Sequence, residues 1–293
     1  GRIGRGVDAT AKWLLKWRII RGPARFIANS RYAYSIIRRT DRIRTNRLRD
    51  RLKIGDLPKH VSIIMDGNRR FAWSKDLENK VGHRHGKDKL KEVLDWVLDL
   101  GIPYLTVYAL STENVAGREV KELSELYSLY INGFDEIRND PRIHNNKVKV
   151  QAVGRLELLP NEVQDAIKRA EESTADYDDF LFTVCLAYGG REEIVDAMRE
   201  VAKEHAKGDL PLDEINTEAI SNRLYTAELP DPDLVIRTSG EERISNFLLW
   251  QIAYTELVFL DVLWPDFKKA DLINAVEEYN SRERRYGGTK GQS

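Results

Sequence analysis

Three stretches of the chain place acidic, basic, amide and hydroxyl side chains directly after apolar runs. The first, DGNRR, follows the run VSIIM, the second, STENVAGRE, follows the run YLTVYAL, and the third, RTSGEERIS, follows the run DLVI. Ten of their polar side chains are candidates for a common site: Asp66, Asn68, Arg69, Arg70, Ser111, Asn114, Arg118, Arg237, Arg243 and Ser245.

These residue types suit the binding of diphosphates. Guanidinium groups match phosphate oxygens, and hydroxyls and the amides at helix starts donate hydrogen bonds to them. Protein sites often hold Mg²⁺ by one or two carboxylates, with substrate phosphates and water completing the octahedron, so Asp66 alone would suffice. Each stretch by itself also has a simpler interpretation, because Asp66, Ser111, Thr112 and Asn114 are common helix-cap or turn residues.

The elements between these stretches predict how they are positioned. Short apolar runs at residues 61–66, 104–110, 148–154, 180–188, 233–238 and 257–262 are typical of strands, and helical patterns separate them. This alternation predicts a single α/β domain with a mostly parallel sheet of about six strands flanked by helices. Because the carboxyl ends of parallel strands share one edge, the three stretches should meet there.

Two helices are predicted near the candidate site. Residues 87–100 carry an apolar stripe at Leu90, Val93, Leu94, Val97 and Leu98, and Gly101 should end that helix. A second helical run should open at Ser245 or Asn246.

Charge divides the chain into two parts. Residues 1–59 carry 17 Lys and Arg against 4 Asp, a balance of +13, and the remainder carries 30 against 43, a balance of −13. With a boundary near IGDLPKH, we expect a basic, helical, amphipathic segment at 1–57 and the α/β domain at 58–293. Residues 1–55 mix tryptophan with lysine and arginine, which suits an anionic membrane surface, although a solvated arm remains an alternative.

Several classes of protein are disfavoured by what the sequence lacks. There is no G-x-x-x-x-G-K-[ST] loop and no G-x-G-x-x-G after a strand, and Asn68 stands where an aspartyl-phosphate phosphatase needs a second acid. A nucleic-acid binder would leave the strand-end residues unexplained, so we expect no nucleic-acid partner. The single cysteine, Cys185, excludes a disulfide framework and fits the cytoplasm, with peripheral attachment to the inner face of the cell membrane as the expected location.

Several motifs in order resemble the cis-prenyltransferases, the undecaprenyl diphosphate synthase family, in a form closer to archaeal and eukaryotic members. They are HVSIIMDGNRRFA, GHRHG, YALSTEN, LAYGGR, DLVIRTSGEERISNFLLWQIAYTEL and DVLWPDF, and the resemblance runs from about His60 to Gly288. It implies a Mg²⁺-dependent transferase that adds isopentenyl diphosphate repeatedly to an allylic prenyl diphosphate with cis stereochemistry, giving a long-chain polyprenyl diphosphate. It also implies a homodimer, in which RERRYGG would contribute to the partner's site.

The resemblance implies roles for individual residues. Asp66 and Asn114 would be catalytic, with Asp66 holding Mg²⁺ on the allylic diphosphate and Glu256 as a second metal-associated acid. Arg237, Arg243 and Ser245 would bind isopentenyl diphosphate. The other substrate-binding residues would be Gly67, Asn68, Arg69, Arg70, Phe71, His83, Ser111, Thr112 and Arg118.

Two departures from the family pattern stand out. Asn79 occupies a position where the family commonly has arginine, and Arg118 matches the family's arginine only if one residue is inserted before it. A non-catalytic scaffold subunit of the same fold is the alternative function, but such a subunit would be expected to lose Asp66 and the arginines. Apolar residues after Gly82 and in LYSLYINGF are candidates to line a tunnel for the product chain, although core packing is the simpler interpretation for most of them.

Overall fold

The computed structural model of the protein describes residues 57–282. Six strands form one sheet in the order β3-β4-β2-β1-β5-β6, and every neighbouring pair is parallel. All six predicted strands are confirmed. Their bounds are β1 His60–Ile64, β2 Tyr104–Tyr108, β3 Val148–Val153, β4 Phe180–Cys185, β5 Leu234–Arg237 and β6 Glu256–Phe259.

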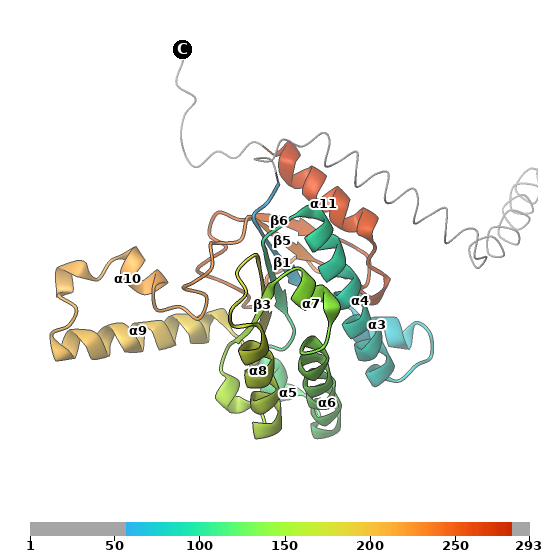
Figure 1. Ribbon diagram of the computed structural model, residues 1–293, viewed down its shortest axis with the longest axis horizontal. Helices are drawn as coiled ribbons and strands as arrows, with labels where there is room; N and C mark the ends of the chain where they lie inside the picture. Colours follow the sequence, from blue (N-terminus) through green and yellow to red (C-terminus); the bar gives the residue numbers. More distant parts are fainter. Residues whose placement is uncertain (1–56, 283–293) are drawn as a thin grey trace, which may run out of the picture. The chain divides into compact units, whose positions relative to one another are not determined.

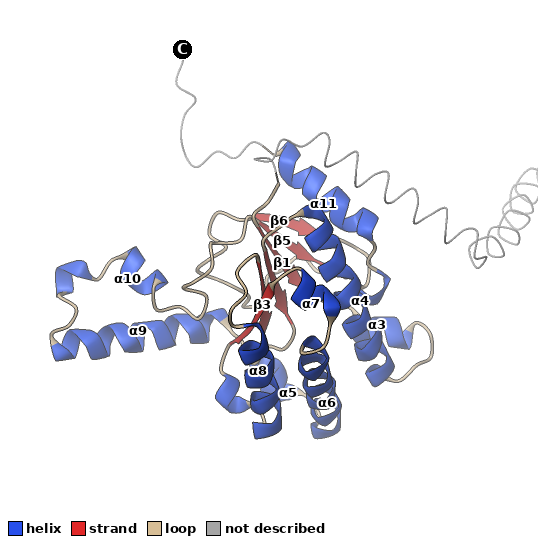
Figure 2. Ribbon diagram, in the orientation of Figure 1, coloured by secondary structure: helices blue, strands red, loops and turns tan. Residues whose placement is uncertain are grey.

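Helices separate successive strands along the chain, except between β5 and β6, and pack around the sheet (Figures 1 and 2). The α-helices are α3 Asn68–Trp73, α4 Asn79–Leu100, α5 Thr112–Gly117, α6 Val120–Ile137, α7 Pro141–Asn145, α8 Asn161–Thr174, α9 Gly190–Lys207, α10 Thr217–Ser221 and α11 Lys269–Ser281. Short 3₁₀ turns lie at η1 Leu156–Leu158, η2 Leu212–Glu214 and η3 Trp264–Asp266. The predicted α/β class with a parallel sheet and flanking helices is confirmed.

Helix α4 includes the predicted helix and begins eight residues earlier, at Asn79. It ends where the sequence indicated, because Gly101 adopts a left-handed conformation with φ of 74° and its amide bonds to the carbonyl of Leu98. Val93, Leu94 and Val97 of the predicted stripe are buried.

Strand β1 is buried along its whole length, as expected for a central strand covered on both faces. At its first residue, the His60 imidazole contacts the carbonyl oxygen of Pro230 at 2.7 Å and the Thr106 hydroxyl at 2.8 Å. Burial disfavours the charged ring and lowers the pKa of His60 to about 4, so the ring is neutral at neutral pH.

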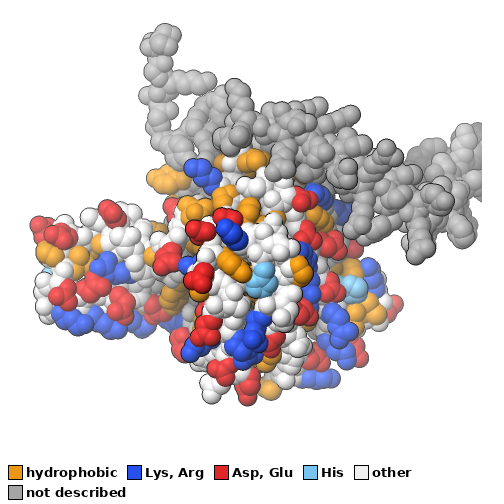
Figure 3. Space-filling view, viewed as in Figure 1, with side chains coloured by type: hydrophobic (Ala, Val, Ile, Leu, Met, Phe, Trp, Pro, Cys, Tyr) orange, Lys and Arg blue, Asp and Glu red, His pale blue; other side chains and the backbone are white. Residues whose placement is uncertain are grey.

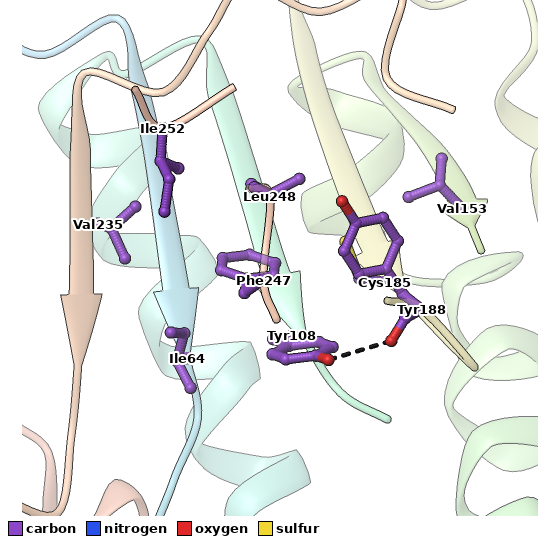
Figure 4. Close-up of a cluster of buried hydrophobic side chains, with 9 residues drawn as sticks. All are labelled: Ile64, Tyr108, Val153, Cys185, Tyr188, Val235, Phe247, Leu248 and Ile252. Carbon is purple, nitrogen blue, oxygen red and sulfur yellow. Dashed lines mark hydrogen bonds between the residues drawn. The ribbon is translucent and has the colours of Figure 1, made fainter. Parts of the chain in front are cut away.

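One face of the sheet is covered by a chain segment without regular helix. Side chains from five strands pack there against Phe247, Leu248 and Ile252, and the Tyr108 hydroxyl donates to the carbonyl of Tyr188 (Figure 4). The Tyr108 and Phe247 rings are stacked with centroids 4.7 Å apart.

The helix predicted to open at Ser245 or Asn246 is absent, since residues 245–254 form a series of turns. Ser245, Asn246 and Leu248 have positive φ angles of 48°, 62° and 45°, and these left-handed residues break a right-handed helix. The segment instead lays its apolar side chains on the sheet.

Helices α9 and α10 project from the left of the sheet in Figure 1. Charged side chains of both signs are intermixed over them in Figure 3. Within residues 57–282 no helix is long and apolar enough to cross a bilayer. Residues 1–56 of the basic segment predicted at 1–57, and the part of RERRYGG after Arg282, lie outside the described residues.

Candidate functional site

The first and third polar stretches meet through a hydrogen bond between Asp66 and Arg237. Strands β1 and β5 are neighbours, with Ile64 level with Arg237, so Asp66 lies just beyond the carboxyl end of β1 beside that arginine. The Arg237 guanidinium donates to the Asp66 carboxylate at 2.8 Å, and Arg70 lies 3.8 Å from the same oxygen. The two partners are 171 residues apart in the sequence.

The local charges keep Asp66 ionised. Partial burial acts to raise the pKa of its carboxyl, but hydrogen bonds from Arg237 and Ser239, with the positive charges of Arg237 and Arg70, outweigh burial and lower that pKa. The Asp66 side chain remains 31% exposed. It is therefore an accessible carboxylate at neutral pH.

Glycines allow the chain after Asp66 to approach α4 closely. Gly67 has a φ of 109°, which favours glycine, and is the N-cap residue immediately before α3. A Cβ at Gly82 would lie 2.2 Å from the backbone oxygen of Asn68, and one at Gly86 would lie 2.4 Å from its side-chain oxygen. The two glycines of the GHRHG motif therefore fix the position of Asn68, whose buried Oδ1 has no hydrogen-bond partner.

The second polar stretch joins α4 and α6 through a chain of hydrogen bonds. Ser111 caps α5 by accepting the Asn114 amide at 3.0 Å, as its simpler interpretation predicted. Arg118 donates to the Asn114 side chain at 3.2 Å and to Glu122 at 3.0 Å. Glu122 also contacts Nε2 of His83 at 3.1 Å.

The His83 side chain is mostly buried, and it joins this network through its contact with Glu122. Burial lowers the pKa of His83 and opposes the Glu122 carboxylate, which acts to raise it. The ring is therefore neutral at neutral pH. Arg118 reaches the site despite the inserted residue in its motif.

The third stretch is organised around the buried Arg237. Its guanidinium donates to the backbone oxygen of Arg243 and, at 2.7 Å, to the Ser245 hydroxyl, and its Nε has no hydrogen-bond partner. The left-handed turn at Ser245 allows this approach. Arg243 itself is 62% exposed and pairs with Glu241.

All three stretches line one pocket of about 860 Å³. Its lining includes twelve of the predicted site residues: Asp66, Gly67, Asn68, Arg69, Arg70, His83, Ser111, Asn114, Arg118, Arg237, Arg243 and Ser245. The prediction that these segments converge on the carboxyl edge of the sheet is confirmed.

The interior of the pocket is apolar. Helix α6 contributes the stripe Leu126, Leu129, Tyr130, Gly133, Phe134 and Ile137, and α4 contributes Leu90 and Leu94. Five of the nine residues of LYSLYINGF therefore line the pocket, and two of these, Leu126 and Phe134, are also buried as expected for core residues. Further along, Lys87 and Lys91 of α4 pair with Glu136 of α6 at 2.8 and 2.5 Å. The lining residues of α6 run from Leu126 to Ile137, about 16 Å along this helix.

Two predicted substrate-binding residues lie outside the pocket lining. Phe71 is buried on α3, where its ring lies 5.3 Å from the ring of His85. Thr112 begins α5, and its hydroxyl donates to Glu113 at 3.3 Å. Asn79, the departure from the family arginine, is the first residue of α4 and also lies outside the lining.

Glu256, the predicted second metal-associated acid, lies at the opposite edge of the sheet. It begins β6 level with Leu234, which is level with Val61, five residues before Asp66. Five residues of strand span about 16 Å. Glu256 instead accepts a hydrogen bond from Arg282 at 2.7 Å. Within one chain, Glu256 and Asp66 therefore cannot share a metal ion.

Sequence reasoning missed two acids: Glu241 lines the pocket, and Glu122 contacts two of its lining residues. Glu122 joins Arg118 to His83, and Glu241 lies 3.5 Å from Arg70. Both are ordinary surface acids by their sequence context. The i+4 spacing of Glu122 from Arg118 was an available signal, because such pairs are neighbours on a helix.

The donors at the carboxyl edge suit a magnesium ion that is completed by substrate. Among residues 57–282 no three acidic, histidine or cysteine side chains form a metal-binding cluster. Asp66 supplies one ionised, accessible carboxylate beside several guanidinium groups. Mg²⁺ is commonly held by one or two carboxylates together with phosphates and water, so this donor set fits it.

Comparison with known proteins identifies the family. The model of the undecaprenyl diphosphate synthase family of prenyltransferases matches residues 64–287. The chain belongs to the undecaprenyl diphosphate synthase family.

Archaeal members of the undecaprenyl diphosphate synthase family are similar over most of their length. The chain is 53% identical over 240 residues to the tritrans,polycis-undecaprenyl-diphosphate synthase (geranylgeranyl-diphosphate specific) of Methanopyrus kandleri, covering 82% of this chain and 88% of that protein. Identity to the protein of the same name from Methanocaldococcus jannaschii is 49% over 234 residues, covering 79% and 83%.

Solved structures of the same enzyme class share the fold. Lavandulyl diphosphate synthase from Lavandula x intermedia, in complex with dimethylallyl diphosphate, has a TM-score of 0.77 and 36% identity, over 80% of this chain and all of that one. A probable undecaprenyl diphosphate synthase from Campylobacter jejuni has a TM-score of 0.65 and 30% identity, over 79% and 99%.

Proposed function

We propose that this undecaprenyl diphosphate synthase family member condenses isopentenyl diphosphate repeatedly onto geranylgeranyl diphosphate, giving a long-chain polyprenyl diphosphate with new cis double bonds. The observation that carries the proposal is the Asp66–Arg237 hydrogen bond, which joins the two segments expected to hold the two substrates at the polar mouth of an apolar pocket. The names of the archaeal relatives supply the primer and the stereochemistry.

The two diphosphates would bind to two different segments at the polar mouth of the pocket. Asn68, Arg69 and Arg70 would hold the allylic diphosphate, and Arg237, Arg243 and Ser245 would hold isopentenyl diphosphate. Arg237 is nearly fully buried, so its fixed charge would act on developing negative charge without rearrangement, an effect worth a few kcal/mol per well-placed donor. Asp66 would hold Mg²⁺, which would neutralise charge on the departing diphosphate.

His83, Ser111 and Asn114 would lie beside the reacting carbon atoms. His83 is neutral and is oriented by Glu122, so it can donate or accept one hydrogen bond. The Ser111 oxygen is already engaged with the Asn114 amide, which fixes its direction.

The apolar interior of the pocket would receive the growing chain. Each CH₂ that leaves water for such a surface is stabilised by about 0.8 kcal/mol before ordering costs. The stripe of α6 would thereby keep water from the allylic cation and favour retention of the intermediate between additions.

We also propose that the protein is a homodimer attached peripherally to the cytoplasmic face of the membrane. Val195 and Met198 on α9 and Tyr254, two residues before β6, are large apolar side chains that are 46%, 40% and 80% exposed, which suits an interface with a second copy. The basic, tryptophan-bearing residues 1–55 suit an anionic lipid surface.

The test is incorporation of radiolabelled isopentenyl diphosphate into butanol-extractable lipid with geranylgeranyl diphosphate as primer. We expect long-chain product that requires Mg²⁺ and is lost on chelation with EDTA. Asp66→Asn should reduce turnover by at least about 10²-fold, whereas Asp88→Asn, at an exposed position of α4 outside the pocket, should not change it. Full turnover by Asp66→Asn, or no turnover by the purified wild type, would refute the proposed function.

A further inference from the structure

Glu241 lies between two arginines that come from different segments of the pocket mouth. One of its carboxylate oxygens is 3.5 Å from Arg70 of α3, and the other is paired with Arg243. These two arginines were expected to hold two different diphosphates. The carboxylate of Glu241 thus takes the place that a phosphate oxygen would take between them.

The backbone around Glu241 is fixed. Ser239 and Gly240 both have positive φ, at 83° and 73°, which turns the chain back toward α3. The turn is anchored because the Ser239 amide donates to Val262 at 2.8 Å and the Gly240 amide donates to Leu260 at 2.9 Å. The position of Glu241 beside the two arginines is therefore set by this anchored turn.

The ion pairs of Glu241 are nevertheless weak enough for a bound diphosphate to replace them. Its side chain is 31% exposed, and those of Arg70 and Arg243 are 42% and 62% exposed. Ion pairs with this exposure contribute about 0–1 kcal/mol each because water screens them. A diphosphate carries more charge and several acceptor oxygens, so it can displace one carboxylate.

We propose that Glu241 is an internal competitor for diphosphate. It occupies Arg70 and Arg243 when the mouth is empty and returns to them as pyrophosphate departs. This role rests on the proposed function, because a repeated condensation must release one pyrophosphate after every addition before the next isopentenyl diphosphate enters. Glu241 would weaken pyrophosphate binding and so shorten the time for which the product blocks the site.

The test compares Glu241→Gln with Glu242→Gln by isothermal titration of each purified protein with inorganic pyrophosphate and Mg²⁺. Glu242 is the adjacent acid and is exposed outside the pocket lining, so its substitution removes the same net charge without removing the two ion pairs. We expect Glu241→Gln to bind pyrophosphate about tenfold more tightly, the effect of losing two exposed pairs, and Glu242→Gln to match the wild type.

Kinetics give a second readout. In Glu241→Gln both KM for isopentenyl diphosphate and kcat should fall, because substrate binding tightens and release slows, with pyrophosphate inhibition strengthened by a similar factor. Equal tightening in both variants would show an effect of net charge alone and would overturn the proposal. Unchanged or weaker binding by Glu241→Gln would also overturn it. The titration does not require turnover. The comparison of the two variants can therefore refute the role of Glu241 while the proposed function stands. An inactive wild type would refute the proposed function separately.

Discussion

Replacing Gly82 with alanine should separate α3 from α4 and displace the diphosphate cradle. The new Cβ would lie 2.2 Å from the backbone oxygen of Asn68 and 3.0 Å from its carbonyl carbon. Real Cβ atoms keep at least 3.0 Å, so α3 must move by about 0.8 Å. The neighbour is backbone, so a side-chain rotation cannot relieve the contact.

Stability and activity should respond differently to Gly82→Ala. Alanine favours the helix over glycine by about 1 kcal/mol, which offsets part of the 1–3 kcal/mol that overpacking costs. The net destabilisation should therefore be at most about 2 kcal/mol. A displacement near 1 Å at a reacting group can lower activity about 10²-fold, and we expect a loss of that size in kcat/KM.

The assay pairs labelled isopentenyl diphosphate incorporation with urea unfolding. The matched control is Gly117→Ala at the end of α5, where the new Cβ has nothing within 4 Å and activity should be unchanged. Full kcat/KM in folded Gly82→Ala would refute the reasoning that these glycines set the position of the cradle.

Two further predictions concern stability and product length. His60 has a folded pKa of about 4, below its unfolded value of 6.5, so the unfolded chain binds more protons in this window and stability should fall by about 3 kcal/mol as pH falls from 6.5 to 4. Urea midpoints across this range should show that slope, and a His60→Asn variant that keeps it would contradict the assignment to His60. Gly133→Leu should shorten the product, because the added side chain enters the apolar pocket from α6, where the nearest atom to a new Cβ is 3.9 Å away. Mass spectrometry of the lipid products would show this, and unchanged lengths would argue against a tunnel along α6.

Much of the fold could be predicted because the strands are buried on both faces and therefore appear as short, continuous apolar runs. Once the runs were assigned to a parallel sheet, the convergence of Asp66, Ser111 and Arg237 followed from the shared direction of the strands. The same argument located the polar mouth of the pocket.

The segment after Ser245 could not be predicted from its pattern. Its spacing of apolar residues suits a helix, but the left-handed conformations of Ser245, Asn246 and Leu248 depend on packing against the sheet and on the hydrogen bond to Arg237. Local sequence carries no signal for such a tertiary constraint.

Glu256 and Glu241 show that a motif match or the local sequence context alone does not predict where a side chain lies in the fold. The metal-associated role that the resemblance implies for Glu256 stays a prediction, and strand register shows only that Glu256 lies at the other edge of the sheet from Asp66 within one chain. Glu241 was overlooked because an acid beside glycine in a turn is usually solvated. Its role depends on Arg70, which is distant in sequence.

The adjacency of β1 and β5 has a consequence for biosynthesis. Asp66 leaves the ribosome early, but Arg237 follows 171 residues later, which takes roughly 10 to 30 s at ordinary translation rates. Until then the nascent sheet exposes the edge of β1 that β5 will cover, so chaperone engagement should be strongest in this interval. A ribosome-bound fragment ending before β5 should also be unable to retain pyrophosphate.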